Sequence, residues 1–183
     1  MEWYVWVILA FLVLDLLLLI FLYNRLIRLR NRIREGWSGI EVQLKRRHDL
    51  IPSLVEVVKG FAGHEKEVLE NVTRERTAAV DANGAANVSR AEENLAKGVV
   101  RLMALVEAYP DLKSDENFRD LMKELVNTED ELQYARRYYN GAVRDLNNAI
   151  ESIPTNVVAW AFRFEEGEFF EVSNEAERMA PKV

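Results

Sequence analysis

The amino-acid sequence predicts an all-α protein in which an N-terminal transmembrane helix continues into an antiparallel bundle of about four long helices. Two observations lead to this prediction. The run of 21 residues from Trp3 to Tyr23 contains one polar residue, Asp15, and a helix of about 20 apolar residues spans the core of a bilayer. Beyond this run, apolar residues recur at steps of three and four, which is the period of an amphipathic helix.

The apolar run has the features of a membrane anchor rather than of a cleaved signal peptide. It lacks a basic start and a small-residue cleavage site, and aromatic residues at both of its ends match the belts found at headgroup level. Basic residues follow the run, whereas its short N-terminal flank offers only Glu2, so the positive-inside rule predicts an outside N-terminus and a cytoplasmic body. We therefore expect a single-pass cell-membrane protein with residues 1–24 as the anchor, residues 25–161 as a cytoplasmic helical bundle and residues 162–183 as an aromatic, mostly non-helical tail.

The charges near the anchor suggest two kinds of contact. The net charge of −6 conceals a split, because residues 1–50 carry +3 and the remaining residues carry −9. The basic residues just after the anchor either only set the topology or also bind anionic lipid headgroups. Asp15 lies near the middle of the span, where an ionised carboxylate costs at least a few kcal/mol, so it is an oligomer contact, an interior-facing polar residue or a tolerated, protonated passenger. The predicted lipid-surface residues are Arg25, Arg28, Arg30, Arg32 and Arg34.

The first part of the body is predicted to continue the anchor helix. No turn signal precedes Arg47, so the helix should run at least that far. Pro52 lacks an N–H group and disfavours a helical Ile51, so a kink or break is expected at residues 49–53. A second helix then resumes and ends at the turn residues 81–84.

Two pairs of glycines lie three residues apart within these predicted helices. They are Gly36 with Gly39 and Gly60 with Gly63. Glycine costs a helix up to about 1 kcal/mol relative to alanine. We therefore expect these positions to mark close approaches between helices.

Two further long helices are predicted in the second half of the chain. Ser89 and Glu92 have the spacing of a capping box, which predicts the start of a third helix that Pro110 ends. Ser114 is predicted to open a fourth helix whose apolar period continues to Ile150. That helix would be about 50 Å long at about 1.5 Å per residue. Short connections predict that consecutive helices are antiparallel neighbours.

The tail differs in character from the bundle. A short helical turn is expected at residues 156–161, and phenylalanines then cluster around Gly167 with acidic residues between them. These aromatic residues either cap one end of the bundle or form a docking patch for a partner or a neighbouring subunit. The candidate docking residues are Phe162, Phe164, Phe169 and Phe170.

The sequence offers little for catalysis or metal binding. It contains no cysteine, no phosphate-binding glycine loop, no Glu-x-x-His and no G-x-S-x-G motif. His48 and His64 could form a metal site with Asp49 or Glu65 only if the break at Pro52 were a hairpin, and structural histidines are the simpler interpretation. We therefore expect no enzymatic activity, no catalytic residue, no metal and no cofactor.

Nucleic-acid binding is also not expected. Lys45, Arg46 and Arg47 extend the basic segment, but a nucleic-acid-binding domain carries a broad basic face. The chain beyond residue 50 carries a charge of −9. The basic groups adjoin the predicted membrane span instead.

Several motifs resemble those of the LemA family. They include the run Gln43-Leu44-Lys45-Arg46-Arg47-His48-Asp49-Leu50-Ile51-Pro52, the triplet Tyr138-Tyr139-Asn140, and the ending Ala180-Pro181-Lys182-Val183. The resemblance covers nearly the whole chain. It implies a prokaryotic membrane protein with one N-terminal transmembrane helix and an all-helical cytoplasmic domain, and relatives in magnetosome-forming bacteria are linked to building internal membranes. It implies no catalytic residues.

Two hypotheses for the function follow. The first is a non-catalytic scaffold that binds membrane lipids, forms homo-oligomers and organises or remodels the membrane. The alternative is a membrane-anchored adaptor that docks a protein partner, such as a membrane protease or a sensor, through the aromatic tail.

Overall fold

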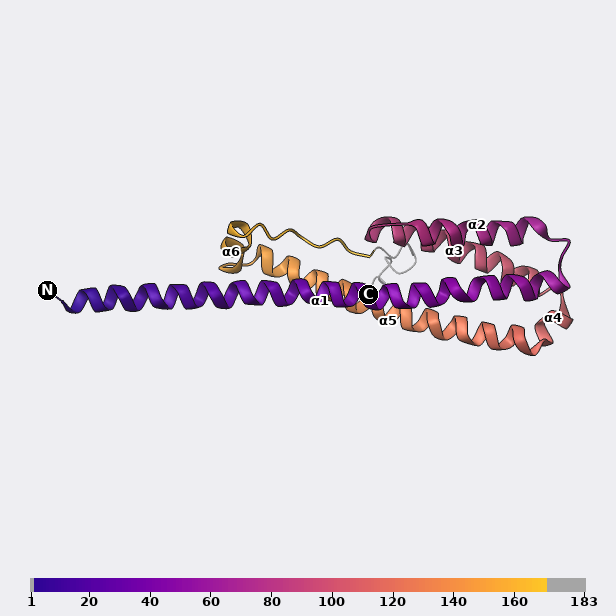
Figure 1. Ribbon diagram of the computed structural model, residues 1–183, viewed down its shortest axis with the longest axis horizontal. Coiled ribbons are helices and arrows are strands. Elements are labelled where there is room, and N and C mark those ends of the chain that lie inside the picture. Colours follow the sequence, from indigo (N-terminus) through magenta and orange to yellow (C-terminus); the bar gives the residue numbers. More distant parts are fainter. Residues whose placement is uncertain (1, 171–183) are drawn as a thin grey trace, which may run out of the picture. The chain divides into compact units, whose positions relative to one another are not determined.

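A computed structural model describes residues 2–170. It confirms the all-α prediction, because these residues form six helices and no strand (Figure 1). The four long helices are the predicted number, and two short helices accompany them. The helices are α1 (Trp3–Phe61), α2 (Lys66–Asp81), α3 (Ala85–Val106), α4 (Pro110–Ser114), α5 (Glu116–Glu151) and α6 (Thr155–Ala161).

The chain divides into two compact units. Among the described residues, unit 1 comprises residues 2–38 and 137–168, and unit 2 comprises residues 39–136 and 169–170. Helices α1 and α5 each contribute to both units. The division into an anchor, a bundle and a tail stays a prediction.

Unit 2 contains the larger apolar core. Every helix segment of this unit contributes to it, because the apolar residues of each helix recur on one face. Helices α2 and α3 pack against each other as an antiparallel pair joined by a short turn (Figure 1). Gly84 in that turn has φ of +82°, a conformation that favours glycine. The core includes Ile51, Leu54 and Val58 from α1, Leu69 and Val72 from α2, Leu95 and Leu102 from α3, Leu112 from α4, and Phe118 and Leu125 from α5.

Of the kink or break expected near Pro52, the break is wrong, because α1 continues through Pro52 to Phe61. Pro52 cannot donate a hydrogen bond to the carbonyl group of His48, four residues earlier. The Nε atom of Arg76 on α2 donates to that carbonyl oxygen at 3.0 Å instead. The neighbouring residues Ile51 and Leu54 are buried. A side chain from another helix therefore replaces the missing backbone bond, and apolar burial stabilises the helix on both sides.

The chain instead turns after residue 61, inside the segment that the sequence analysis assigned to one helix. Residues 62–65 lie between α1 and α2, and the N–H group of Glu65 donates to the carbonyl oxygen of Ala62 at 3.1 Å. Gly63 lies in this turn, and a Cβ atom at Gly60 would meet open space. A Cβ atom at Gly63 would lie 3.0 Å from the carbonyl oxygen of Lys59, four residues earlier, so this tight contact is local, and the close approach between helices predicted for Gly60 and Gly63 is not observed.

The predicted helix starts at Ser89 and Ser114 are also wrong. Helix α3 begins four residues earlier, at Ala85, and Glu92 is buried rather than folded back on the helix end. Ser114 is the last residue of α4. The start of α5 is capped by Asp115, whose Oδ1 atom accepts a hydrogen bond from the N–H group of Phe118 at 2.9 Å.

Unit 1 contains a close contact between α1 and α5 that depends on a glycine. A Cβ atom at Gly36 would lie 3.0 Å from the Cα atom of Tyr139. This confirms the close approach predicted for Gly36, whereas Gly39 makes only ordinary van der Waals contact. The ring of Trp37 packs on that of Tyr139 with centroids 5.6 Å apart.

The non-helical segment after α6 is held along unit 1 by side chains of α5. Asn147 bonds the backbone of Gly167 twice, accepting from its N–H group at 2.8 Å and donating to its carbonyl oxygen at 3.1 Å. The hydroxyl group of Tyr139 donates to the carbonyl oxygen of Glu168 at 2.8 Å. Burial, and then the charge of Glu168, raise the pKa of Tyr139, so its hydroxyl group keeps the proton that it donates.

Candidate functional site

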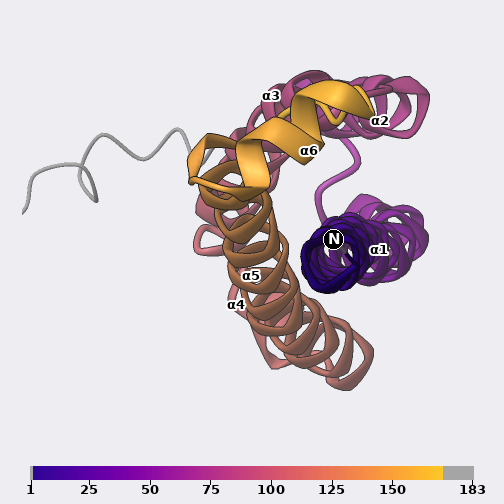
Figure 2. The same cartoon turned by 90° about the vertical axis from the view of Figure 1, so that its left-hand side faces the viewer.

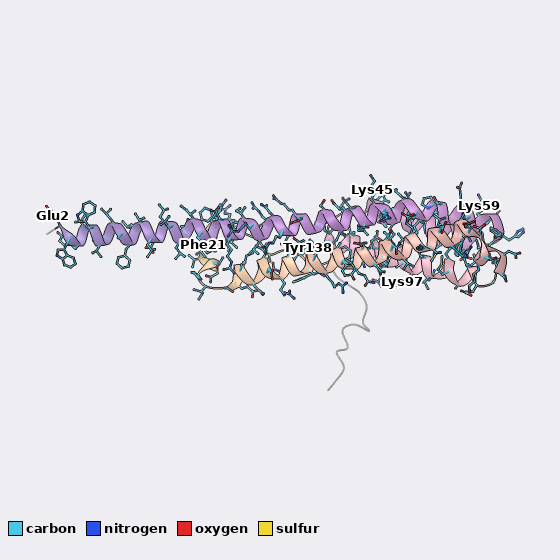
Figure 3. The ribbon with its side chains drawn as sticks, turned by 90° about the horizontal axis from the view of Figure 1, so that it is seen from below. Glu2, Phe21, Lys45, Lys59, Lys97 and Tyr138 are labelled. Atoms are coloured by element: carbon cyan, nitrogen blue, oxygen red, sulfur yellow. The ribbon has the colours of Figure 1, made fainter. Side chains whose placement is uncertain are left out.

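The first part of α1 is an exposed apolar helix. Every residue from Glu2 to Phe21 is exposed, and an 18-residue window of α1 near the N-terminus has a mean hydropathy of 3.1. Figure 3 labels Glu2 and Phe21, which lie at its two ends. By length and composition, this is the one helix among the described residues that could cross a membrane. Asp15 is exposed within the segment.

The five arginines predicted to contact lipid follow this segment directly, and all of them are exposed. Arg25, Arg28 and Arg32 share one side of α1 because they are spaced by three and four residues. They line an open cavity of about 540 Å³, opposite polar residues of α5. Arg30 faces elsewhere, with its guanidinium carbon 5.3 Å from the ring centroid of Phe164.

The cavity has the composition of an anion site next to an apolar surface. Its lining combines three arginines with a single carboxylate, Asp145, and with the hydrogen-bonding side chains of Asn148 and Ser152. Phe21, at the end of the exposed apolar segment, forms part of the same lining. Guanidinium groups bind phosphate through charge-assisted hydrogen bonds. The cavity therefore suits an oxyanion such as a lipid phosphate.

The four tail phenylalanines are divided between the two units. Phe162 and Phe164 belong to unit 1 and pack on Tyr23, with ring centroids 4.8 and 5.9 Å from its ring. Phe169 and Phe170 belong to unit 2, where Phe170 is only 2% exposed and lies against the guanidinium group of Arg136. Phe162 and Phe169 are exposed. The docking role stays a prediction, and these two are the side chains that a partner could reach.

The two histidines lie apart. His48 is on α1, and His64 is in the turn after Phe61, about 20 Å further along the helix axis. The hairpin that a shared site needs is absent, because α1 is continuous through Pro52. Among residues 2–170, no group of three or more histidine, aspartate or glutamate side chains is placed to hold a metal ion.

His48 instead belongs to a buried ionic cluster that the sequence analysis did not identify. The carboxylate of Glu92 on α3 is 1% exposed. Its Oε1 atom lies 2.6 Å from Nε2 of His48, and its Oε2 atom accepts a hydrogen bond from Nη1 of Arg47 at 3.1 Å. Glu129 on α5 lies 3.4 Å from the same Nη1 atom. The cluster joins α1, α3 and α5 of unit 2, and we refer to these four residues as the ionic cluster.

Arg136 on α5 interacts electrostatically with the charged residues of the ionic cluster. Burial lowers the pKa of Arg136 from its ordinary value, the charge of Glu129 opposes this shift, and the charge of Arg47 adds to it.

One signal for the ionic cluster was present in the sequence. His48 occupies a position where the helical period requires an apolar residue, which indicates a buried polar side chain. Glu92 gave no comparable signal, because its spacing from Ser89 matched a capping box.

Comparisons with known proteins place the chain in a family. A sequence profile described as the LemA family matches residues 36–183. The chain is 26% identical over 175 residues to magnetosome protein MamQ 2 of Paramagnetospirillum magneticum, with 81% of this chain and 64% of that protein covered. It is 26% identical over 174 residues to magnetosome protein MamQ of Magnetospirillum gryphiswaldense, with the same coverage.

A further relative carries the family name itself. Protein LemA of Metamycoplasma hominis is 27% identical over 139 residues, with 74% of this chain and 63% of that protein covered. The chain thus spans slightly less than two thirds of the length of the curated relatives that it matches. Since the profile matches most of the sequence, the chain belongs to the LemA family.

Proposed function

We propose that the protein is a non-catalytic, single-pass membrane protein that acts as an oligomeric scaffold and organises or remodels the membrane. One observation carries the proposal. Within unit 1, the exposed apolar segment and the part of α1 that packs on α5 and α6 are one uninterrupted helix. A bilayer that takes up residues 3–22 therefore holds the rest of unit 1 directly at its surface, without a flexible linker.

The basic cavity supports a lipid-binding surface at that position. Arg25 is the first charged residue after the apolar segment, and together with Arg28 and Arg32 it gives the cavity a net positive charge. An anionic leaflet attracts basic residues near its surface. The same arginines favour an orientation with the N-terminus outside and the body in the cytoplasm. The relatives named as magnetosome proteins are consistent with a role at a membrane.

Asp15 supports self-association. An acidic side chain in the middle of a span is costly unless it finds a polar partner or becomes protonated. No Lys, Arg or His occurs between Trp3 and Tyr23. A second copy of the same helix supplies such a partner, because two Asp15 side chains that share a proton can hydrogen-bond to each other.

The mass of the full-length protein in mild detergent tests the proposal. We expect discrete assemblies by light scattering and electron microscopy. Asp15→Asn retains a hydrogen-bonding side chain, so this variant should keep the assembly, whereas Asp15→Leu should shift it toward smaller species. A monomeric wild-type protein would contradict the scaffold. If the wild-type protein and both variants form the same assembly, the scaffold proposal remains and Asp15 is not part of its interface.

The second candidate function is an adaptor that captures a membrane-bound partner. It rests on the exposure of Phe162 and Phe169. Because Phe164 and Phe170 pack within the units, deleting the whole tail would also disturb folding. We therefore propose Phe162→Ser with Phe169→Ser as the test, in which cross-linking to a partner is lost while circular dichroism stays unchanged. Unaltered cross-linking in this double variant would contradict the adaptor.

A further inference from the structure

Helix α6 and the residues beside it expose large apolar side chains to solvent. Trp160 is 83% exposed and Ile153 is 84% exposed, and Val157 and Phe162 are also exposed. The opposite side of α6 is buried, because Val158 packs into the apolar core of unit 1. Both sides of this short helix, which follows α5 (Figure 2), therefore carry apolar side chains, and those on one side are buried whereas those on the other are exposed.

The position of α6 along α1 shows what could cover the exposed face. Helix α6 packs on Leu22 and Leu26, and the ring of Phe162 lies 4.8 Å from that of Tyr23. From Trp3 to Leu22 a helix rises about 29 Å, which matches the thickness of about 30 Å of a bilayer core. Helix α6 therefore lies at the level where the apolar segment ends.

We propose that the exposed face of α6 lies in the headgroup region of the leaflet that α1 enters, so that a lipid surface covers it. The inference rests on the proposed membrane insertion of α1. The contact surface consists of Ile153, Val157, Trp160 and Phe162, and we refer to it as the α6 lipid face. Because it adjoins the exposed apolar segment of the same unit, one bilayer covers both surfaces.

The chemistry of the segment fits an interface between lipid and water. Tryptophan is enriched at membrane interfaces, since its ring is apolar and its N–H group binds polar partners. Residues 153–164 contain no acidic side chain and one basic side chain, Arg163, so anionic headgroups are not repelled. Helix α6 together with α1 thus gives each protein two points of contact with the leaflet, which fixes the rotation of unit 1 about the α1 axis.

Quenching of a single tryptophan by brominated lipid tests the proposal on the full-length protein. The chain has four tryptophans, at positions 3, 6, 37 and 160. Replacing Trp3, Trp6 and Trp37 by Phe leaves Trp160 as the only reporter, and circular dichroism checks the fold. The protein is reconstituted in phosphatidylcholine–phosphatidylglycerol vesicles, with bromine placed near the headgroup or near the chain end. We expect Trp160 emission to fall to about half or less with bromine near the headgroup, and much less with bromine at the chain end.

Two matched reporters separate this inference from the membrane anchor. L12W in a chain without other tryptophans reports on the middle of the span. Trp37 alone is a control within unit 1, because it lies about 22 Å beyond Leu22 along α1 and packs on Tyr139. We expect strong quenching of L12W by bromine at the chain end, and none of Trp37.

The outcomes are distinct. Quenching of both L12W and Trp160 supports the α6 lipid face. Quenching of L12W alone overturns the α6 lipid face and leaves the anchor in place. This holds both when acrylamide in the aqueous phase quenches Trp160 and when another copy of the protein shields Trp160 from acrylamide. Absence of quenching in both reporters overturns the anchor as well as this inference.

Discussion

Glu92 binds two adjacent basic residues of α1 from a position more than 40 residues away in the sequence. Its two carboxylate oxygens lie 3.1 Å from Nη1 of Arg47 and 2.6 Å from Nε2 of His48. All three side chains are almost fully buried. Removing one member of a buried ion pair leaves the other charge without compensation, which costs more than the pair itself contributes.

We therefore predict that Glu92→Ala lowers the free energy of unfolding by about 3–5 kcal/mol. Urea denaturation followed by circular dichroism in mild detergent would measure it. The matched control is Glu124→Ala, because Glu124 pairs with the neighbouring Arg46 at 2.9 Å but both side chains are half exposed. An exposed pair contributes less than about 1 kcal/mol. Equal losses in the two variants would contradict a special role for the ionic cluster.

The candidate site was only partly predictable from single residues. The five arginines after the apolar run and Asp15 within it stood out as candidate residues, because charges next to or inside such a run are unusual, and their roles stay predictions. Glu92 was not recognisable, because its partners come from α1 through a contact that the local sequence does not encode. The surface proposed on α6 was not predicted as one surface, because isolated apolar residues in a short segment do not indicate whether they are buried or exposed.

At the scale of elements, the continuity of α1 through Pro52 depends on another helix. The carbonyl oxygen of His48 lost its backbone donor to the proline, and the Nε atom of Arg76 replaces that donor at 3.0 Å. Helix α2 therefore stabilises α1 at its weakest backbone position. This bond links residues 28 positions apart, so the sequence pattern around Pro52 predicted a break that does not occur.

We predict that the cost of losing Arg76 depends on Pro52. Arg76→Met should lower the free energy of unfolding by about 1–3 kcal/mol, since it leaves a carbonyl group without a donor. In a Pro52→Ala background the alanine N–H group bonds that carbonyl, so the same substitution should cost clearly less. A double-mutant cycle in urea measures the coupling. Additive effects of the two substitutions would refute the proposed replacement of the backbone bond.

The contact between α1 and α5 in unit 1 is controlled by Gly36. Figure 3 labels Tyr138, which donates its hydroxyl hydrogen to Glu35 across the two helices at 3.2 Å. A Cβ atom at Gly36 would lie 3.1 Å from Cδ1 of Tyr138 and 3.0 Å from the backbone of Tyr139. Because backbone atoms cannot rotate away, the two helices would have to move apart.

We predict opposite effects of alanine at two glycines of α1. Gly36→Ala should destabilise unit 1 by about 1–3 kcal/mol through overpacking. Gly60→Ala, where the added methyl group meets open space, should stabilise the chain by about 0.5–1 kcal/mol through helix propensity. Fluorescence of Trp37, which packs on Tyr139, would report on the first variant, and circular dichroism on both. Stabilisation by Gly36→Ala would show that the helices can separate without cost.

The long helices were predictable and their ends were not. A fourth helix was predicted to open at Ser114 with an apolar period that continues to Ile150, and α5 spans Glu116–Glu151. The helix ends are harder to predict, because several neighbouring residues can each act as the cap. Ser89 and Ser114 both matched cap signals, but the observed cap at α5 is Asp115, one residue after Ser114. The turn at residues 62–65 contains no proline, so the sequence indicates this turn less strongly than it indicates a break at Pro52.

For the molecule as a whole, the uneven distribution of charge along the sequence determines which part of the chain an anionic leaflet attracts. The first 50 residues carry +3 and the remainder −9, so the arginines after the span lie on the part of the chain that an anionic leaflet attracts. Each basic residue near such a surface contributes about 1 kcal/mol. This attraction falls with rising salt, because counterions screen exposed charges.

We predict that replacing Arg25, Arg28, Arg30, Arg32 and Arg34 by Gln weakens the preference for anionic over neutral vesicles and removes its dependence on salt. The same variant should insert with mixed orientation, which protease protection of the body would measure. The control replaces five exposed basic residues of unit 2, namely Lys45, Arg90, Arg101, Arg119 and Lys123. If the two variants behave alike, net charge rather than the position of the arginines determines the effect.

The ionic cluster also has a consequence for the time course of synthesis. The ribosome makes Arg47 before Glu92, which follows 45 residues later. At about 5–20 residues per second this interval is roughly 2–9 s. During that time the side chains of Arg47 and His48 must stay hydrated, because their partner carboxylate does not yet exist. The ionic cluster therefore forms only after Glu92 of α3 has been made.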